Sequence, residues 1–353
     1  MQRQQLIQSW LETLFPNLSP VLTPASADAS FRRYFRAKLS NGEHYIVMDA
    51  PPQHEDCRPF VFVGQLFAAA GLNVPRVLQQ NLLEGFLLLT DFGDETYLNR
   101  LNPTGSLPDL TAAPVGAADR SQVRHPDSHA LYTDATDALI RLQLASEPGK
   151  LPEYDRALLT RELQLFPEWY VAKHLNITAS PDQIKQLQTV FARLLDNNLA
   201  QGRVFVHRDY HSRNLMVTSP NPGILDFQDA VYGPITYDLV SLLKDAYISW
   251  DEARVLDWAI RYWEKARRAQ LPVPADFADF YRDFEWMGMQ RHLKVLGIFA
   301  RLCHRDGKAA YVRDMPLVLD YVRRTAVRYA EFGPLLRLLD EWRGAVADSN
   351  YTF

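Results

Sequence analysis

The chain has 353 residues, of which 47% are hydrophobic and 23% are charged, and its formal net charge is −4. A chain of this length exceeds a typical single domain, so we expect two lobes around a cleft. The charge balance shows no basic excess, which argues against a protein that binds nucleic acid or an anionic membrane surface.

The N-terminal segment from Leu6 to Phe15 carries apolar side chains at helical spacing. It lacks the continuous apolar core of a signal peptide, and no later segment is long and apolar enough to cross a bilayer. Cys57 and Cys303 lie far apart without metal-ligand spacing, so we expect free thiols in a reducing compartment. We therefore expect a soluble, cytoplasmic monomer with neither a nucleic-acid nor a membrane partner.

Residues 1–92 are predicted to form an N-terminal, nucleotide-binding lobe built on a small antiparallel β-sheet. Short apolar runs and alternating patterns, separated by turn residues, predict strands around one packed helix. The predicted elements are a strand over 31–39, a turn at 40–43, a strand over 45–48, a helix over 60–70 that ends at Gly71, and strands from 74 and from 87.

The composition changes over residues 101–130, where Pro, Gly, Ser, Asp and Ala dominate and no apolar period is visible. We interpret residues 93–130 as the exit from a hinge followed by a mobile insertion. Helical periods dominate over residues 131–353, which are predicted to form a mostly helical C-terminal lobe. The whole chain is therefore predicted to be an α+β fold of two lobes.

The C-terminal lobe contains the sequence His-Arg-Asp-Tyr-His-Ser-Arg-Asn over residues 207–214, between two short apolar runs that are predicted strands. Kinases use a loop aspartate to accept the proton of the attacking hydroxyl, with an asparagine five positions later and a second aspartate as magnesium ligands. Asp209, Asn214 and Asp226 fit these roles. The alternative is a hairpin whose acidic residues only cap turns.

Asp91-Phe92-Gly93 matches the metal-binding tripeptide of kinases by letter, but it lies far upstream of the catalytic loop. The metal aspartate follows that loop in kinases, so this second match is a decoy. We expect instead a hinge in which backbone groups of Thr90, Asp91 and Phe92 meet an adenine.

With this motif and two predicted lobes, the chain resembles the aminoglycoside phosphotransferase and choline kinase-like family, which shares the protein-kinase-like fold. The resemblance covers about residues 21–340. It implies ATP and Mg²⁺ as cofactors, Asp209 as the base, and Asn214 and Asp226 as magnesium ligands. It also implies that Asp238 is a structural brace behind the catalytic loop.

Three further segments are similar to the anomeric sugar kinases of bacterial cell-wall recycling, which phosphorylate C1 of N-acetylmuramate and N-acetylglucosamine. They are DASFRRYFR at 28–36, MDAPP at 48–52 and WMGMQRHLKVLG at 286–297. This closer resemblance implies a small-molecule sugar and a nucleotide as partners, in peptidoglycan recycling. An anomeric hydroxyl is more acidic than an ordinary sugar alcohol, so a weakly basic carboxylate is an adequate base.

The chain departs from the kinase pattern at the ion pair between a strand lysine and a helix glutamate, which holds the nucleotide phosphates. The lysine position falls at Met48, flanked by Asp49, and the glutamate position falls near Phe60. Both partners are missing. The loss of both is self-consistent, because the loss of one would leave an uncompensated charge.

The segment 26–30, which is expected to cover the phosphates, contains no glycine. We hypothesise that the Ser30 hydroxyl and the guanidinium of Arg32 or Arg33 replace the missing lysine, since a guanidinium matches phosphate oxygens bidentately. The alternative is that these arginines face solvent on an exposed β-ribbon.

Candidate sugar-binding residues come from four parts of the chain. They are Arg213 in the catalytic loop, Gln228 and Asp229 after the metal aspartate, Gln290, Arg291 and His292 on a predicted helix, and the aromatic pair Trp169 and Tyr170. We favour Asp229 and Arg291, because an arginine suits the lactyl carboxylate of N-acetylmuramate. Alternatively, Arg291 and His292 lie on a solvated helix face and Trp169 belongs to the core.

Two rival functions remain open. A kinase of the same family acting on aminoglycosides or choline would need an acidic or aromatic pocket for a cationic substrate, whereas the segment around Arg291 is basic. A non-catalytic pseudokinase would explain the missing ion pair, but not the intact Asp209, Asn214 and Asp226. Phosphate transfer distinguishes these alternatives.

Overall fold

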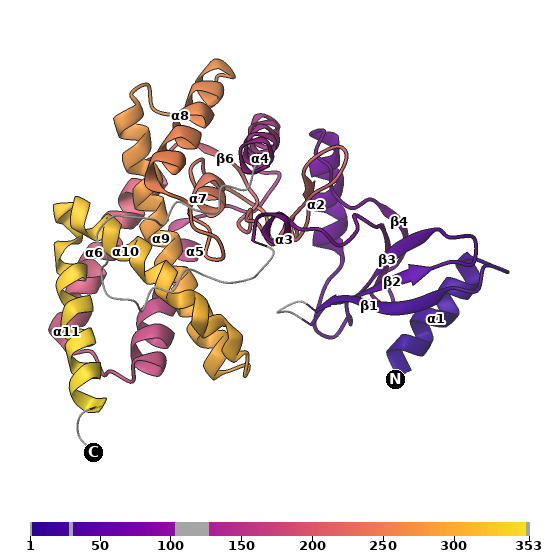
Figure 1. Cartoon of the computed structure of the whole chain (residues 1–353), viewed down its shortest axis with the longest axis horizontal. Helices are drawn as coiled ribbons and strands as arrows, with labels where there is room; N and C mark the ends of the chain where they lie inside the picture. Colours follow the sequence, from indigo (N-terminus) through magenta and orange to yellow (C-terminus); the bar gives the residue numbers. More distant parts are fainter. Residues whose placement is uncertain (1, 28–30, 103–126, 351–353) are drawn as a thin grey trace. The chain divides into compact units, whose positions relative to one another are not determined.

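The computed structural model describes residues 2–27, 31–102 and 127–350 (Figure 1). The chain divides into two compact units. Met1–Tyr97 with Asn214–Ala230 forms the first, which we call the sheet unit. Leu98–Arg213 with Val231–Phe353 forms the second, which we call the helical unit. The predicted α+β class is confirmed.

The sheet unit is built on a five-stranded antiparallel sheet with the strand order β1-β2-β3-β5-β4. Its strands are β1 (Val21–Ala27), β2 (Arg33–Lys38), β3 (His44–Asp49), β4 (Val77–Asn81) and β5 (Phe86–Thr90). The strand predicted from residue 74 begins only at Val77, because Pro75 has no backbone N–H to give to a strand ladder.

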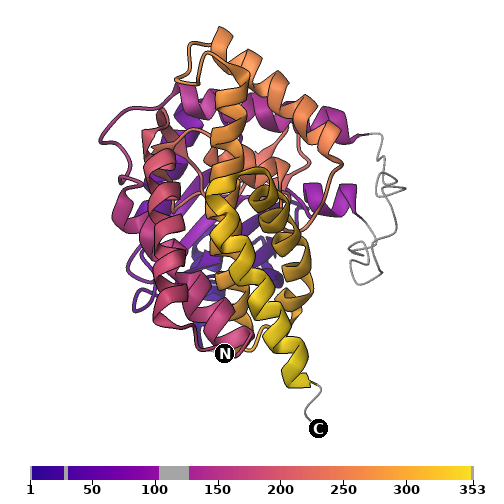
Figure 2. The ribbon, with the colours of Figure 1, turned by 90° about the vertical axis from the view of Figure 1, so that its left-hand side faces the viewer.

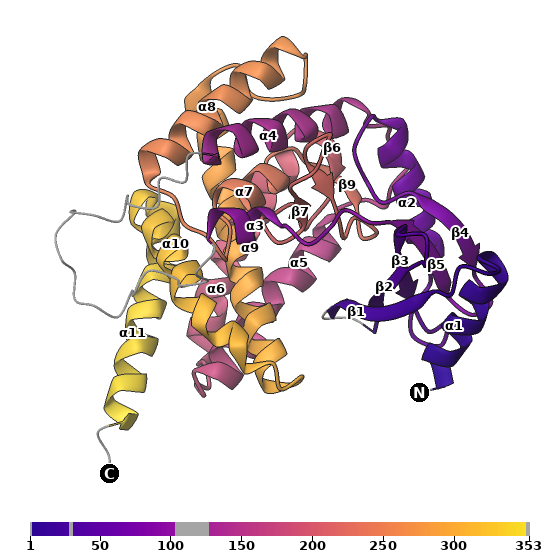
Figure 3. The ribbon, with the colours of Figure 1, turned by 45° about the vertical axis from the view of Figure 1, so that its right-hand side comes forward.

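Helix α1 (Gln2–Leu14) lies against this sheet (Figure 3), and its apolar stripe packs on it. Ile7 and Leu11 are fully buried and contact the core of the sheet, which includes Phe35, Val47, Phe86 and Leu88. The amphipathic pattern at the N-terminus therefore belongs to the fold.

Helix α2 (Arg58–Ala69) ends before Gly71, which takes a left-handed conformation with φ +76°. Glycine adopts this conformation without the strain that a Cβ would add. The rings of Phe60 and Phe67 lie 4.7 and 5.8 Å from the ring of Phe227, measured between centroids. These contacts join α2 to the segment that contains Asp226.

The predicted hairpin consists of the antiparallel strands β7 (Leu215–Met216) and β8 (Gly223–Ile224), which belong to the sheet unit. A Cβ on Gly223 would lie 2.7 Å from the ring of Phe92, so a larger residue there would require the ring to shift. In the helical unit, β6 (Arg203–Val206) pairs with β9 (Val231–Pro234).

The helical unit is organised around α9 (Phe277–His304), which has 28 residues. A Cβ on Gly297 would lie 2.4 Å from the backbone carbonyl of Leu165, so this glycine permits close packing of α9. The elements that contact α9 are α5 (Arg156–Leu165), η1 (Phe166–His174), α6 (Pro181–Ala200), α7 (Tyr237–Leu243), α8 (Glu252–Arg268), η2 (Ala309–Asp314) and α10 (Met315–Arg328).

After η3 (Ala330–Phe332), helix α11 (Gly333–Asn350) contacts α6 and α10, and it is drawn in yellow in Figure 2. Both cysteines are free thiols, as predicted. Among the described helices, none combines the length and the apolar content that a membrane crossing requires.

Much of the segment predicted as a mobile insertion lies outside the described residues, which omit 103–126. At its two ends, α3 (Tyr97–Leu101) and α4 (Ser128–Leu144) are helical. The domain boundaries at residues 92 and 130 stay a prediction.

Candidate active site

The catalytic-loop backbone before Asp209 is held by three hydrogen bonds within the helical unit. Arg208 has φ +76°, which is uncommon for a residue with a Cβ. The Asp238 carboxylate, at the start of α7, accepts the backbone N–H groups of His207 at 2.6 Å and Arg208 at 3.0 Å. The Arg291 guanidinium donates to the Arg208 carbonyl at 3.0 Å. These contacts fix a strained conformation, which is a common feature of functional sites.

Asp209 itself is partly exposed. Burial alone would raise the pKa of its carboxyl. The positive charges of Lys294 and Arg291, followed by His211 and Arg208, outweigh burial and lower this pKa to about 2. Asp209 is therefore a carboxylate at neutral pH.

Glu162, on α5, is the buried counter-charge of this cationic group. Its carboxylate lies 2.9 Å from Lys294 Nζ and 2.6 Å from the Arg208 guanidinium, and it accepts a hydrogen bond from the Tyr154 hydroxyl. Lys294 also donates to the Tyr237 hydroxyl at 2.9 Å. The Glu162 side chain is only 6% exposed, so its pairing with two cations compensates charges that would otherwise be costly to bury.

The second half of the catalytic loop is tied to the segment after α7. The Ser212 backbone N–H donates to the Asp245 carboxylate at 2.9 Å, and both residues are buried. The Arg213 guanidinium lies over the ring of Tyr247, 3.6 Å from its centroid. The ring of His211 contacts the same tyrosine, with 5.4 Å between centroids.

The two predicted magnesium ligands lie together in the sheet unit. Asn214 Nδ2 is 3.5 Å from Asp226 Oδ2, and the Leu225 N–H donates to the Asn214 carbonyl at 2.9 Å. Asp226 has φ +61°, and Gln228 Nε2 donates to its other carboxylate oxygen at 2.8 Å.

The donor set suits magnesium. An amide turned by 180° would present the Asn214 oxygen instead, and Mg²⁺ prefers such hard oxygen ligands. The described residues contain no group of three or more His, Cys, Asp and Glu placed for a metal. Sites that share Mg²⁺ with phosphate need only one or two protein ligands, so the pair of Asn214 and Asp226 fits such a site.

Arg32 and Arg33 have different surroundings. The Arg32 side chain is 10% exposed, and its guanidinium lies 3.7 Å from Asp226 Oδ1. Arg33 instead pairs with the fully buried carboxylate of Asp49, which also binds Arg3 at 2.6 Å. The alternative that these arginines face solvent on an exposed β-ribbon is wrong for Arg32, because Arg32 is buried. Ser30 lies outside the described residues.

The positions of the missing ion pair have other uses here. Met48 is buried in β3 of the sheet, and Phe60 packs on Phe227. The absent lysine and glutamate are thus replaced by apolar packing.

In the predicted hinge, the Asp91 carboxylate binds the Arg36 guanidinium at 3.0 Å and accepts the Gly93 N–H at 2.8 Å. The Thr90 N–H donates to the Arg76 carbonyl at 3.1 Å. These bonds occupy the Asp91 side chain and the Thr90 N–H.

The candidate sugar residues divide by burial. Gln290 is fully buried and donates to the Leu159 carbonyl at 3.0 Å. Arg291 and His292 are also buried, so a solvated helix face is wrong for both. His292 lies 2.9 Å from the Lys244 carbonyl. The bonds of Gln290, Arg291 and His292 support packing and loop geometry.

Trp169 and Asp229 are the more accessible candidates. Trp169 lies in η1 and is partly exposed, which differs from a buried core position. Asp229 is exposed, and Gln228 Nε2 lies 3.3 Å from its carboxylate. The two residues belong to different units.

Sequence reasoning missed Glu162, Lys294, Asp245 and Tyr247. Lys294 lies within the WMGMQRHLKVLG segment, three residues after Arg291, which places both on one side of a helix. That spacing was the available signal. Glu162, Asp245 and Tyr247 carried no signal, because ordinary helix and loop patterns surround them.

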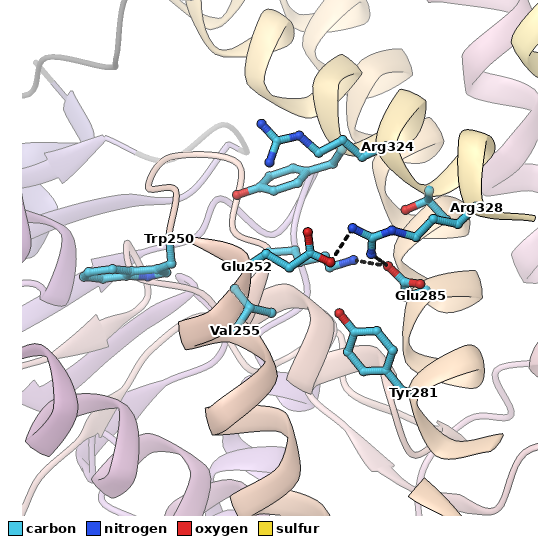
Figure 4. A pocket seen from close by; sticks show the side chains of 10 residues that line it. Trp250, Glu252, Val255, Tyr281, Glu285, Arg324 and Arg328 are labelled. Carbon is cyan, nitrogen blue, oxygen red and sulfur yellow. Dashed lines mark hydrogen bonds and ion pairs between the residues drawn. The ribbon is translucent and has the colours of Figure 1, made fainter. Parts of the chain in front are cut away.

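Figure 4 shows a pocket in the helical unit in which Lys244, Glu252, Glu285 and Arg328 form ion pairs with one another. Glu285 is 2% exposed and binds Lys244 at 3.2 Å and Arg328 at 2.6 Å, and Arg328 also pairs with Glu252. Arg324 binds Asp320, outside this pocket, at 2.7 Å. These pairings indicate a structural ion-pair cluster.

Comparison with known proteins identifies the family. The profile of the Phosphotransferase enzyme family matches residues 21–277. A Neisseria meningitidis protein named N-acetylmuramate/N-acetylglucosamine kinase is 48% identical over 100% of both chains. A Pseudomonas aeruginosa protein of the same name is 47% identical over 96% of each chain.

Solved structures agree on the fold. The choline kinase LicA from Streptococcus pneumoniae superposes with a TM-score of 0.60 at 12% identity, covering 91% of this chain and 99% of its own. The family profile and the two relatives match this chain in sequence, and the superposition shows that its backbone fold is also similar. The chain belongs to the Phosphotransferase enzyme family.

Proposed function

We propose that this protein uses ATP to phosphorylate the anomeric C1 hydroxyl of N-acetylmuramate and N-acetylglucosamine, in peptidoglycan recycling. The observation that carries the proposal is the 48% identity, over the full length of both chains, with a kinase named for these two sugars. The proposal includes action as a monomer in the cytoplasm, where ATP is available.

Asp209 is the proposed base. Its pKa of about 2 keeps it ionised at neutral pH, so it can orient the anomeric hydroxyl and accept its proton. The hydrogen bonds that Asp238 accepts and that Arg291 donates support the proposal, because they hold the loop backbone that carries Asp209. Asp238 and Arg291 are thus proposed positioning residues.

Asn214 and Asp226 are the proposed ligands of Mg²⁺. Bound magnesium would neutralise negative charge that develops on the transferred phosphoryl group. The short distance between the two side chains and the oxygen ligands they offer support this assignment.

For the nucleotide, we propose that Arg32 does the work of the missing lysine. Its buried guanidinium lies beside the proposed magnesium ligand Asp226, whereas Arg33 is occupied by Asp49. Ser30 and the backbone at Asp91 and Phe92 complete the proposed nucleotide contacts, whereas the Thr90 N–H is bonded to the Arg76 carbonyl.

For the sugar, we propose Asp229 as a partner of the hydroxyl groups and Trp169 as an apolar surface for the ring. Trp169 is partly exposed, and Asp229 is exposed. Gln228 orients Asp229 in this proposal, since its amide lies 3.3 Å from that carboxylate. Gln290 belongs to the supporting packing.

The test is ADP formation by the purified protein with Mg²⁺ and ATP, using four acceptors in parallel. Turnover with N-acetylmuramate and N-acetylglucosamine but not with choline or an aminoglycoside would support the proposal. Turnover with choline or the aminoglycoside alone would overturn the substrate assignment. Absence of turnover with every acceptor would favour a pseudokinase.

A further inference from the structure

The guanidinium of Arg213 is held by neighbouring side chains but remains partly exposed to solvent. It stacks on Tyr247 at 3.6 Å and lies 6.0 Å from the ring centroid of Tyr311. Asp314, which is buried, is 4.0 Å away, and the Arg213 side chain remains 34% exposed. The aromatic face and the carboxylate fix the plane of the guanidinium while part of it stays open to solvent.

The other arginines around the catalytic loop are committed to the protein. Arg291 is buried and donates to the Arg208 carbonyl, and Arg208 binds Glu162 at 2.6 Å. Within the described part of the chain, Arg213 has no hydrogen-bond partner. Its contacts are an ion pair with Asp314 at 4.0 Å and the rings of Tyr247 and Tyr311. Its N–H groups are therefore the ones available for an incoming acceptor.

A guanidinium in this state suits a carboxylate. Its fork of N–H donors matches two carboxylate oxygens, and stacking on an aromatic ring leaves the donor edge free. Because Tyr247 already orients the group, binding costs less side-chain entropy than it would with a mobile arginine. The pairing with Asp314 is too long to satisfy the donors.

The position of Arg213 in the chain connects it to the reaction. Arg213 follows Asp209 by four residues, which cover at most about 14 Å when fully extended. Asp245 binds Ser212, so the loop segment next to Arg213 is anchored. One sugar with an acidic substituent can therefore reach both side chains.

We propose that Arg213 binds the lactyl carboxylate of N-acetylmuramate and determines specificity between the two sugars. N-acetylglucosamine lacks this carboxylate and cannot form the contact. The inference rests on the proposed function and deepens it. From the sequence, Arg291 was favoured as the residue that binds the lactyl carboxylate, and this role is now assigned to Arg213.

The test compares kcat and KM for both sugars in the wild-type protein and in Arg213→Gln. We expect KM for N-acetylmuramate to rise about 10- to 100-fold, as for loss of a charge-assisted hydrogen bond. For N-acetylglucosamine, kcat/KM should change by less than about threefold. The matched control is Arg313→Gln, whose side chain is 65% exposed beside the same Asp314 and should leave both sugars unchanged.

A second arm uses the wild-type protein alone and does not depend on folding of the variant. The methyl ester of N-acetylmuramate removes the negative charge, and its KM should rise by the same factor as in Arg213→Gln. Equal changes for both sugars, or an ester that performs as well as the acid, would overturn the role of Arg213. A wild-type protein that phosphorylates neither sugar would instead overturn the proposed function, and this role with it.

Discussion

The buried charge cluster around Glu162 predicts a large and cooperative effect of the substitution Glu162→Gln. The substitution removes the negative charge that lies 2.9 Å from Lys294 and 2.6 Å from Arg208. Two buried cations then lack compensation, which costs about 3–5 kcal/mol. For a folding unit of this size, the melting temperature should fall by roughly 6–20 °C.

The assay is a thermal melt of four proteins: wild type, Glu162→Gln, Lys294→Met and the double variant. The double variant should lose less stability than the sum of the single variants, because methionine removes one of the uncompensated charges. The control is Glu147→Gln, which breaks the exposed pair with Lys150 and should cost less than about 1 kcal/mol. A Glu162→Gln melt as mild as that of the control, or strictly additive losses, would show that Glu162 does not compensate the charges of Lys294 and Arg208.

Two further predictions concern nucleotide binding and pH. Arg32→Ala should raise KM for ATP about 10- to 100-fold in steady-state kinetics. Arg33→Ala should leave that KM within about twofold, but it should lower thermal stability because it removes a partner of Asp49. Equal effects of the two substitutions on KM would contradict the assignment of Arg32 to the nucleotide. His292 is buried, and burial lowers its pKa from 6.5 to about 3, so the unfolded chain takes up a proton that the native protein excludes. Stability should therefore fall by about 1.4 kcal/mol per unit as pH drops from 6.5 towards 3, and melts of His292→Gln across this range should show a shallower slope.

The proposed catalytic and metal residues could be selected from the sequence because phosphoryl transfer fixes both the types and the spacing of the residues it uses. Asp209, Asn214 and Asp226 could be assigned roles from the 207–214 motif and the hairpin that follows. The α+β class followed from a change of period along the chain, from alternating strands to helical repeats.

The surroundings of these residues could not be predicted in the same way. The sequence does not show which side chains are buried. Arg291 was therefore a candidate for substrate binding, whereas its side chain is buried and donates to the loop backbone. The partnership of Glu162 with Lys294 joins residues 132 positions apart and depends on how α5 packs on α9. Likewise, only the packing of Tyr247 distinguishes Arg213 from an ordinary loop arginine.

Phosphorylation at C1 with Asp209 as the base is tested by phosphorus NMR of reactions in which the wild-type protein or Asp209→Asn is mixed with magnesium, ATP and N-acetylmuramate. The wild-type protein should give a new phosphate resonance coupled to the anomeric proton, which identifies phosphorylation at C1. Asp209→Asn should keep a native thermal melt and lose nearly all of this product. A product phosphorylated at another hydroxyl, or substantial turnover by Asp209→Asn, would contradict the account.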